Sequence, residues 1–267
     1  MVVVPYMGEV GRRICKENEV SWFDLSGNAH ITAPGLRVRI EGRPNRFRTR
    51  GRPPNVFAPK SARIARVLLL NPNRHFAQKD LAEEAKLGPG YTSRIVRTLE
   101  AEGLVSRSGG RVRVKNPNLL LEAWHEAYSF DRHRLLKGHI AARTSDALLR
   151  DLSSKLQEDD TEHAFTGLAA AWLWTRFAGF RIVTVYLEET PDSDLFDEIG
   201  FRETDGGDNT WLVIPNDNDV FRGATEIDGI RCASPLQVFL DLKGHPERAE
   251  EAALRLREEY LDFDRDD

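Results

Sequence analysis

Polar and basic side chains recur at helical spacing between residues 91 and 98, directly after Pro89 and Gly90. They are Tyr91, Thr92, Ser93, Arg94, Arg97 and Thr98. Such side chains on the first turns of a helix can donate hydrogen bonds to base edges in the major groove or to phosphates. The backbone N–H groups that a helix start leaves free can face a phosphate as well. The segment is therefore predicted to contact DNA.

Arginines around a Gly109-Gly110 pair form a second candidate group. The two glycines can adopt the positive φ angles of a tight hairpin turn, so strands are expected on either side. Period-two alternation puts Arg111 and Arg113 on one face, with Arg107 on the other strand. We expect the three arginines to clamp a phosphate or to enter the minor groove. The alternative is that they are solvated surface residues of a protein-docking module.

A segment rich in arginine, glycine and proline runs from Gly42 to Pro54. Because this composition cannot pack a core, the segment is expected to be an exposed basic linker. Its arginines include Arg46, Arg48 and Arg50, which could follow the phosphate backbone without reading sequence. A purely solvated linker is the alternative, and the predicted DNA-contacting segments that follow favour the phosphate contact.

Two carboxylates near the N-terminus allow a catalytic interpretation. Asp24, with Glu41-Gly42-Arg43 on a later strand, loosely matches the Asp…Glu-x-Lys metal site of restriction-type nucleases. Arginine replaces the lysine of that motif, and it stays protonated at neutral pH, so it cannot act as a base. A nuclease that uses Asp24 and Glu41 is therefore the less favoured alternative. We expect Asp24 and Asn28 to stabilise the turn around Gly27 instead.

The segment that begins at Phe165-Thr166-Gly167 resembles part of a minimal nucleotidyltransferase, in which a helix leads into a strand with two metal-binding acids. The corresponding strand carries Thr184 and Tyr186 at the alternate positions. Two such neutral groups cannot anchor Mg²⁺ and the phosphates of a nucleotide. If this fold is present, it is expected to be degenerate and to have no catalytic residues.

No other motif points to catalysis. The sequence has no P-loop, GxGxxG, HExxH, GxSxG or EF-hand pattern, and its seven histidines are scattered. We therefore expect no enzyme activity, no cofactor and no metal. Cys15 and Cys232 lie too far apart for a CxxC motif and are predicted to be buried thiols. With no signal peptide and no apolar run of about 20 residues, the protein is expected to be cytoplasmic, without a membrane partner.

The net charge of −4 conceals an uneven distribution of charge along the sequence. Residues 1–137 hold 25 Lys and Arg against 13 Asp and Glu, a charge of +12. Residues 138–267 hold the remaining 13 and 29, a charge of −16. This split indicates a module that binds a polyanion, joined to a module that avoids polyanions or meets basic surfaces.

The elements that must position these residues are predicted to form an α+β fold in three parts. Residues 1–57 are expected to hold a short amphipathic helix, a small antiparallel β meander and the arginine-rich linker. Residues 58–133 are expected to form a winged helix-turn-helix. Its parts are two helices, a third helix from Tyr91 to Ala101, the Gly-Gly hairpin as the wing and a connecting helix.

Residues 134–267 alternate between helical and strand patterns and are predicted to form an acidic, mixed α/β domain. Helices are expected at 145–156 and 166–177, and strands at 181–187, near 201 and at 211–214. Ser234-Pro235-Leu236-Gln237 is a capping box, so a helix starts there and runs to Lys243. Pro246 starts a last helix, which is expected to pack on the sheet through an apolar face.

Short motifs along the chain resemble, in their order, those of the AbiEi-type antitoxins of type IV toxin–antitoxin and phage abortive-infection systems. They are Phe23 to Ala29, Tyr91 to Arg94, Glu102 to Val105, Leu120 to Tyr128, Phe165 to Ala170, Ser234 to Gln237 and Leu240 to Leu242. The resemblance spans most of the chain and implies a winged-helix transcriptional regulator that represses its own operon. It also implies a C-terminal domain that counteracts a nucleotidyltransferase toxin without a stable complex. The long segment ahead of the winged helix departs from the shortest family members.

The residues and the resemblance together predict a sequence-specific regulator that binds double-stranded operator DNA. On the family interpretation it is an antitoxin that represses its own toxin–antitoxin operon. The main alternative is a ligand-sensing winged-helix transcription factor without a toxin, whose C-terminal domain binds a small molecule. The sequence favours neither a monomer on direct repeats nor a dimer on a palindrome.

Overall fold

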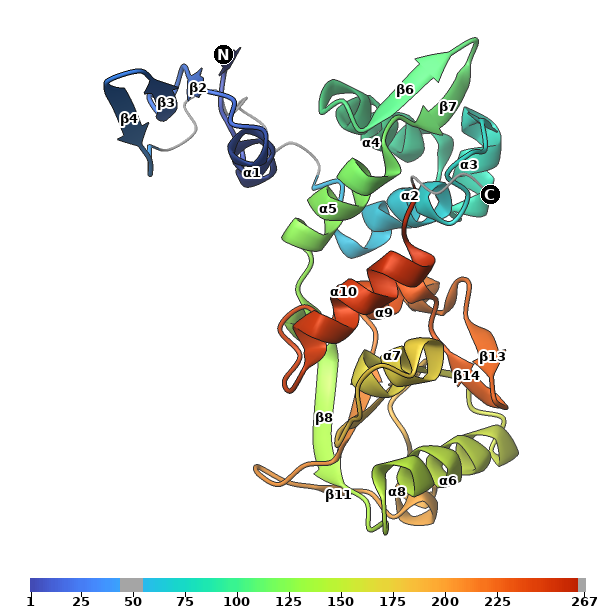
Figure 1. Cartoon of the computed structure of the whole chain (residues 1–267). Helices are drawn as coiled ribbons and strands as arrows, with labels where there is room; N and C mark the ends of the chain where they lie inside the picture. The colour runs from blue at the N-terminus through green and yellow to red at the C-terminus, as the bar shows by residue number, and fades with distance from the viewer. Residues whose placement is uncertain (44–54, 264–267) are drawn as a thin grey trace. The chain divides into compact units, whose positions relative to one another are not determined.

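The computed structural model of the protein describes residues 1–43 and 55–263. The chain forms two compact units, residues 1–55 and 56–267. Within the described residues, ten α-helices and three β-sheets make a mixed α+β fold (Figure 1), which is the class that the sequence predicts. The second unit covers residues 58–133 and 134–267, which are separate parts in the sequence prediction.

The N-terminal unit contains a helix and a four-stranded sheet with the order β1-β2-β3-β4. Its elements are β1 (Val2–Val4), α1 (Glu9–Glu17), β2 (Trp22–Asp24), β3 (Ala29–Ala33) and β4 (Leu36–Ile40). The predicted meander is present as β2, β3 and β4, which pair antiparallel. β1 pairs parallel with β2, so the sheet is mixed rather than purely antiparallel. Three consecutive valines show no alternation, so the sequence gives no signal for this strand.

Three helices and a three-stranded sheet follow. They are α2 (Pro59–Leu69), β5 (Phe76–Ala77), α3 (Gln78–Glu84), α4 (Pro89–Ala101), β6 (Val105–Ser108) and β7 (Arg111–Val114), and the sheet order is β5-β7-β6. The hairpin closes because Gly109 and Gly110 have φ angles of 57° and 77°, which glycine adopts without strain. β5 is too short to be recognised from sequence and exists through its pairing with β7.

A connecting helix, α5 (Pro117–Ala127), packs against α2. The core between these helices and the small sheet includes Ile64 and Ile95, which are fully buried, and Trp124, which is nearly so. The Asn116 side chain accepts a hydrogen bond from the Leu119 N–H and thereby caps the start of α5. The predicted connecting helix is thus present.

A seven-stranded sheet organises the rest of the chain, with the order β11-β8-β12-β10-β9-β14-β13. Its strands are β8 (Arg134–His139), β9 (His163–Thr166), β10 (Val183–Leu187), β11 (Arg202–Glu203), β12 (Thr210–Ile214), β13 (Thr225–Ile227) and β14 (Ile230–Cys232). β9 and β10 are buried along their whole length, because helices cover both faces of the sheet. β10 pairs parallel with β12 and antiparallel with β9.

Helices and two short 3₁₀ turns surround this sheet. They are η1 (Phe130–Arg132), α6 (Ser145–Glu158), α7 (Gly167–Thr175), α8 (Ser193–Ile199), η2 (Asn218–Phe221), α9 (Pro235–Asp241) and α10 (Ala249–Tyr260). α7 and α9 lie on one side of the sheet, and α6 and α8 lie on the other (Figure 1). The prediction that the last helix packs on the sheet is wrong. α10 packs mainly on α7 and α9, because these two helices already cover that face.

Cys15 and Cys232 are both buried free thiols, as the sequence predicts. Among the helices of the described residues, none is long and apolar enough to cross a bilayer.

Candidate nucleic-acid interface

α4 turns one face to the core and another to solvent. Gly88 lies in an extended conformation before the helix, and Pro89 occupies its first turn, where a missing N–H costs nothing. On the core side Ile95 is fully buried. Arg94 and Arg97, three positions apart, are both exposed, so one turn of α4 presents two guanidinium groups.

Tyr91 fixes the start of α4 against α2. Its hydroxyl lies 2.6 Å from the Ser61 Oγ, and its ring faces the Arg94 guanidinium, with 5.5 Å between the ring centroid and Cζ. This stacking restricts the orientation of Arg94 without neutralising its charge. Ser93 and Thr98 are partly exposed, and the Thr98 hydroxyl donates to the Arg94 carbonyl. Both hydroxyls thus lie near the exposed arginines.

Thr92 is placed differently from its neighbours in the predicted set. It is fully buried, and its hydroxyl has no hydrogen-bond partner among the described residues. Thr92, Ile95 and Leu99 form the core-facing stripe of α4 at i, i+3 and i+7. Thr92 is therefore a core residue and not a candidate DNA contact, which the same spacing could have indicated from the sequence.

The hairpin divides its arginines between two faces. Arg111 and Arg113 alternate with the buried Val112 and are exposed on the outer face. Arg107 lies opposite Val112 in the register and therefore shares the inner face. Its Nη2 lies 2.6 Å from the Glu100 Oε2 on α4. Arg107 thus ties the hairpin to α4 and is partly neutralised, which distinguishes it from Arg111 and Arg113.

Arg46, Arg48 and Arg50 of the predicted linker lie outside the described residues.

Asp24 in the N-terminal unit stabilises a turn. Its two carboxylate oxygens accept hydrogen bonds from the backbone N–H groups of Met7 and Asn28 and from the Asn28 side-chain amide, at 2.9 to 3.0 Å. Burial raises the pKa of Asp24, but these hydrogen bonds outweigh it and leave the pKa below its usual value. Glu41 is instead bonded to Arg39 on the surface. The structure thus shows the turn role expected for Asp24 and does not bring Glu41 to its carboxylate.

A buried carboxylate that the sequence does not predict lies beside the strand with Thr184 and Tyr186. Asp241, at the end of α9, is fully buried and accepts hydrogen bonds from Thr166, Tyr128, Tyr186 and the Gln237 amide. Burial raises its pKa to about 6, although all four donors favour the charged form. Gln237 and Asp241 are polar residues at i and i+4 on an otherwise apolar helix. This spacing could have indicated a buried polar cluster from the sequence.

His133 closes the other side of this cluster. Its Nδ1 accepts a hydrogen bond from the Asn216 N–H at 3.2 Å, so in the neutral ring the Nε2 carries the proton. That Nε2 lies 2.9 Å from the Tyr128 hydroxyl and 3.3 Å from the Tyr186 hydroxyl. Burial, with a smaller contribution from the Arg66 charge, lowers the pKa of His133 to about 4. The imidazole is therefore neutral at physiological pH.

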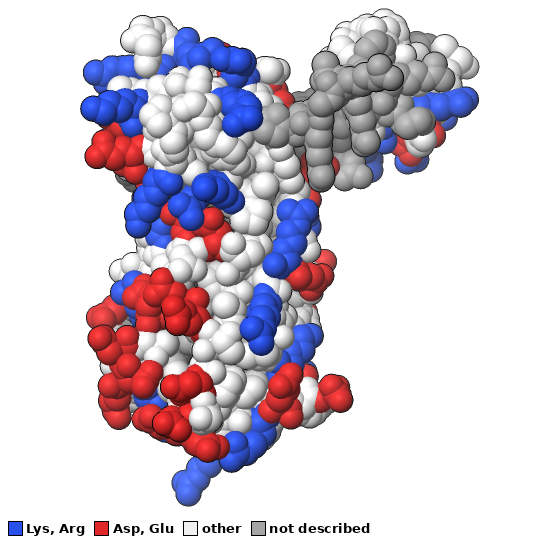
Figure 2. All heavy atoms as spheres, turned by 180° about the vertical axis from the view of Figure 1, so that it is seen from behind, with Lys and Arg blue, Asp and Glu red and all other residues white. Residues whose placement is uncertain are grey.

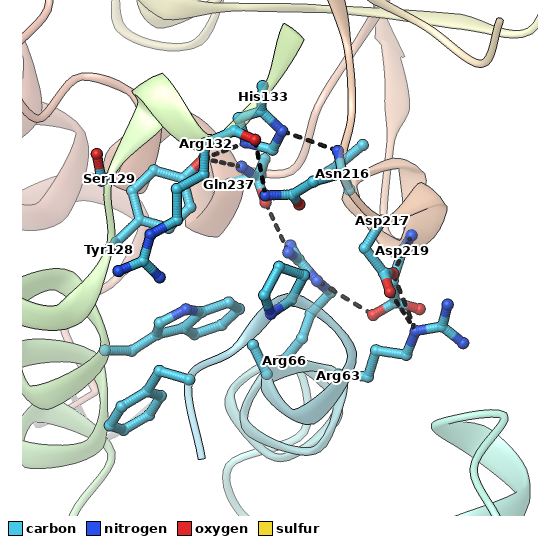
Figure 3. Close-up of a pocket in the computed structure, with 15 residues that line it drawn as sticks. Arg63, Arg66, Tyr128, Ser129, Arg132, His133, Asn216, Asp217, Asp219 and Gln237 are labelled. Atoms are coloured by element: carbon cyan, nitrogen blue, oxygen red, sulfur yellow. Dashed lines mark hydrogen bonds and ion pairs between the residues drawn. The ribbon is translucent and has the colours of Figure 1, made fainter. Parts of the chain in front are cut away.

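Two guanidinium groups of α2 reach the acidic side of the second unit (Figure 3). The Arg63 Nε lies 2.9 Å from an oxygen of Asp217. The Arg66 Nη2 donates to the Gln237 Oε1 at 2.6 Å, and the Arg66 Nε lies 3.2 Å from the Asp219 Oδ2. These pairs join α2 to η2 and α9. They are not among the sequence predictions, although the position of Arg66 on the same helix face as apolar residues such as Leu69 was a signal.

Charge is distributed over the second unit in the way that the sequence suggests. Figure 2 shows Lys and Arg gathered at the end formed by residues 59–114, whereas Asp and Glu predominate toward the end formed by residues 134–267. The basic end carries α4 and the hairpin. This end is therefore the surface most suited to a polyanion.

Comparison with known proteins gives one family. Its model, described as "Transcriptional regulator, AbiEi antitoxin, Type IV TA system", matches residues 113–262. No curated protein and no solved structure matches the chain. The match begins in β7 and extends through α10, so the helices of residues 59–101 lie before it.

Proposed function

The chain belongs to the AbiEi antitoxin family of transcriptional regulators, and we propose that it represses its own toxin–antitoxin operon by binding operator DNA. The proposed DNA-binding part is a winged helix-turn-helix formed by α2, α3, α4 and the β5-β7-β6 sheet. In it α4 is the recognition helix and the β6–β7 hairpin is the wing.

The observation that carries this proposal is the set of exposed arginines that lack an acidic partner. Arg94 and Arg97 on α4 and Arg111 and Arg113 on β7 have no ion pair among the described residues, and Arg113 only donates to the Ser106 hydroxyl at 3.3 Å. Arginines of the acidic part are paired much more often, as in Arg150–Asp146. Unpaired guanidinium groups keep their full charge for phosphate and base edges.

We assign different tasks to the two groups of arginines. Arg94 and Arg97, with Ser93 and the Tyr91 ring, read or position bases in the major groove, because they lie on the first turns of α4. Arg111 and Arg113 hold phosphate or the minor groove, because they project from a hairpin strand. Thr98 can contribute a phosphate contact.

The second part of the proposal concerns residues 134–267. We propose that this acidic part counteracts a nucleotidyltransferase toxin without forming a stable complex, as the family implies. Residues 138–267 within it carry a charge of −16, which disfavours contact with nucleic acid. Asp241 fits a structural role better than metal binding, because side-chain donors already occupy its carboxylate.

Binding of the purified protein to its own upstream DNA, measured against a scrambled duplex over a salt series, tests the first part. Each phosphate contact steepens the dependence of log K on log salt by about 0.9, so several contacts give a steep slope. We expect a steep slope and a large preference for the upstream duplex. A steep slope without preference, or no binding, would contradict the repressor role.

Co-expression with the adjacent gene tests the second part. We expect the full chain to restore growth when the neighbouring toxin is induced, and affinity purification to recover no stable complex. Failure to restore growth would remove the antitoxin role and leave the DNA-binding result intact.

A further inference from the structure

A small cavity lies where α2, α5, η1 and η2 meet (Figure 3). Its volume is about 30 Å³. The polar residues in its wall include Arg63, Arg66, Arg132, His133 and Asn216, and Trp124 forms part of the apolar wall. The cavity shares Tyr128, His133 and Gln237 with the Asp241 cluster, whereas Asp241 itself is not part of its wall.

Arg66 lines this cavity with an unsatisfied guanidinium. The Arg66 side chain is 6% exposed. Its guanidinium lies over the ring of Trp124, with 5.0 Å between the Arg66 Cζ and the ring centroid. Nη2 donates to Gln237, but Nη1 has no hydrogen-bond partner among the described residues. Nε lies near Asp219 without the geometry of a hydrogen bond. A buried charged donor without an acceptor is strongly unfavourable, so an acceptor from outside the chain is expected.

The charges around the cavity favour an anion over water. Its wall holds three guanidinium groups, those of Arg63, Arg66 and Arg132, and two carboxylates, those of Asp217 and Asp219. Behind the wall lie one further guanidinium, that of Arg222, whose Nε is 2.8 Å from the Asp219 Oδ1, and one further carboxylate, that of Asp241, whose charge acts on Arg66. His133 is neutral at physiological pH. The surroundings are thus positive overall, and the potential attracts a negative group.

The size of the cavity selects the kind of anion. One water-sized group needs about 10 to 15 Å³, so about 30 Å³ accommodates two such groups. Two oxygen atoms on one carbon match this space, and the planar edge of a guanidinium matches a carboxylate in geometry.

We propose that this cavity is a binding site for the carboxylate group of a small molecule, with Arg66 as its buried anchor and Arg132 as a second cation at its edge. Arg132 is exposed, and its guanidinium has no partner among the described residues. The bound carboxylate links α2 to η1 and η2. The proposal is independent of DNA binding, since none of these residues belongs to the proposed DNA-contact set.

Crystals of the full chain provide the direct test. One set is soaked in sodium formate and a second in sodium bromide without any carboxylate. We expect formate density within hydrogen-bond distance of the Arg66 Nη1. Ordered water alone in the formate crystals would overturn the proposal. Bromide at Arg66 in the second set, with no formate in the first, would also overturn it and indicate a halide site.

Thermal unfolding in solution supplies a second measurement, at constant ionic strength with formate replacing chloride. We expect a saturable rise in Tm for the wild type and none for Arg66→Met. Arg132→Gln should weaken formate binding by about two- to five-fold, because an exposed charge contributes modestly. The matched control, Arg143→Gln, removes another exposed arginine that does not line the cavity and should bind like the wild type.

Arg66→Met removes a buried charge and can impair folding. In that event Arg132→Gln and Arg143→Gln, both at exposed positions, decide the solution test. A Tm that rises equally and without saturation in the wild type and both variants would be a general salt effect and would contradict the proposal.

Discussion

Replacement of Arg94 and replacement of Arg111 are expected to weaken DNA binding in different ways. Arg94→Ala should weaken binding to the operator by about 5- to 150-fold, which corresponds to 1–3 kcal/mol, and affect the scrambled duplex less. Arg111→Ala should weaken both duplexes similarly and lower the salt slope by about one. Arg143→Ala is the matched control. Equal loss on both duplexes for Arg94→Ala would remove Arg94 from base readout.

The contrast between Arg107 and Arg111 shows what the sequence could predict about the site. Alternation along the strands correctly places Arg111 and Arg113 together on an exposed face. It does not reveal that Glu100 on α4 pairs with Arg107, because that contact depends on how the hairpin packs on the helix. Local periodicity thus predicts exposure, whereas ion pairing between elements needs the tertiary structure.

Asp241 and His133 should make opposite contributions to the pH dependence of stability. The folded pKa of Asp241 is raised to about 6 from 3.8, so its contribution to stability falls as pH rises between these values. The folded pKa of His133 is lowered from 6.5 to about 4, so its contribution falls as pH drops between these values. Each shift corresponds to roughly 3 kcal/mol, and the two largely cancel in the wild type.

Single variants should expose each contribution. In Asp241→Asn the free energy of unfolding should drop as pH is lowered from about 6.5 to about 4, because His133 remains and the lowered pKa values of His163 and His245 act in the same sense. In His133→Gln the contribution of Asp241 remains. The dependence of the free energy of unfolding on pH should therefore shift toward lower stability at higher pH. Urea unfolding over this range measures both. Parallel curves for the wild type and Asp241→Asn would contradict the assignment.

At the scale of elements, the start of α7 depends on one glycine. Gly167 has a φ of +62°, and a Cβ there would lie 3.1 Å from the His245 Nε2 and 3.2 Å from the Thr184 Oγ1. Gly167→Ala combines backbone strain with overpacking, so it should lower the free energy of unfolding by about 2–4 kcal/mol. Chemical denaturation measures this.

Gly179→Ala is the control for this prediction. Gly179 is exposed, and no atom lies within 4 Å of a Cβ built there. Its replacement should change stability by less than about 0.5 kcal/mol. Equal effects of the two substitutions would show that α7 tolerates a side chain at its first residue.

The elements that the sequence predicts are those with strong local signals. α6 begins at the capping residue Thr144, α9 begins after Ser234, and the hairpin turns at two glycines. β9 and β14 are missed, because they are three or four residues long and are held by neighbours far away in sequence. β9 is buried along its whole length and so carries no alternation, and β14 alternates but is too short for its pattern to stand out, so only their pairing identifies them.

At the scale of the molecule, the basic and acidic parts of the second unit are joined by polar contacts, of which the one made by Arg66 is buried. Arg66 contacts Gln237, and the Lys243 Nζ donates to the backbone carbonyls of His125, Glu126 and Tyr128 at 2.6 to 3.0 Å. These carbonyls lie at the end of α5, where a helix leaves acceptors unsatisfied and favours a cation. Separation of the two parts would break these bonds, so we expect them to unfold together.

Native-state hydrogen exchange tests this cooperativity. Amides of α2 and α5 should exchange with the same free energy of opening as those of β9 and β10, because opening either part breaks the bonds that Arg66 and Lys243 make across the junction. Lys243→Met should lower both values equally, by about 1–3 kcal/mol, since three carbonyls lose a charged donor. Lys155→Met, which removes a solvent-facing pair with Asp151, should lower them by less than about 0.5 kcal/mol. If only one part responds to Lys243→Met, the two parts unfold independently, and a signal in the acidic part could not reach α4 through this junction.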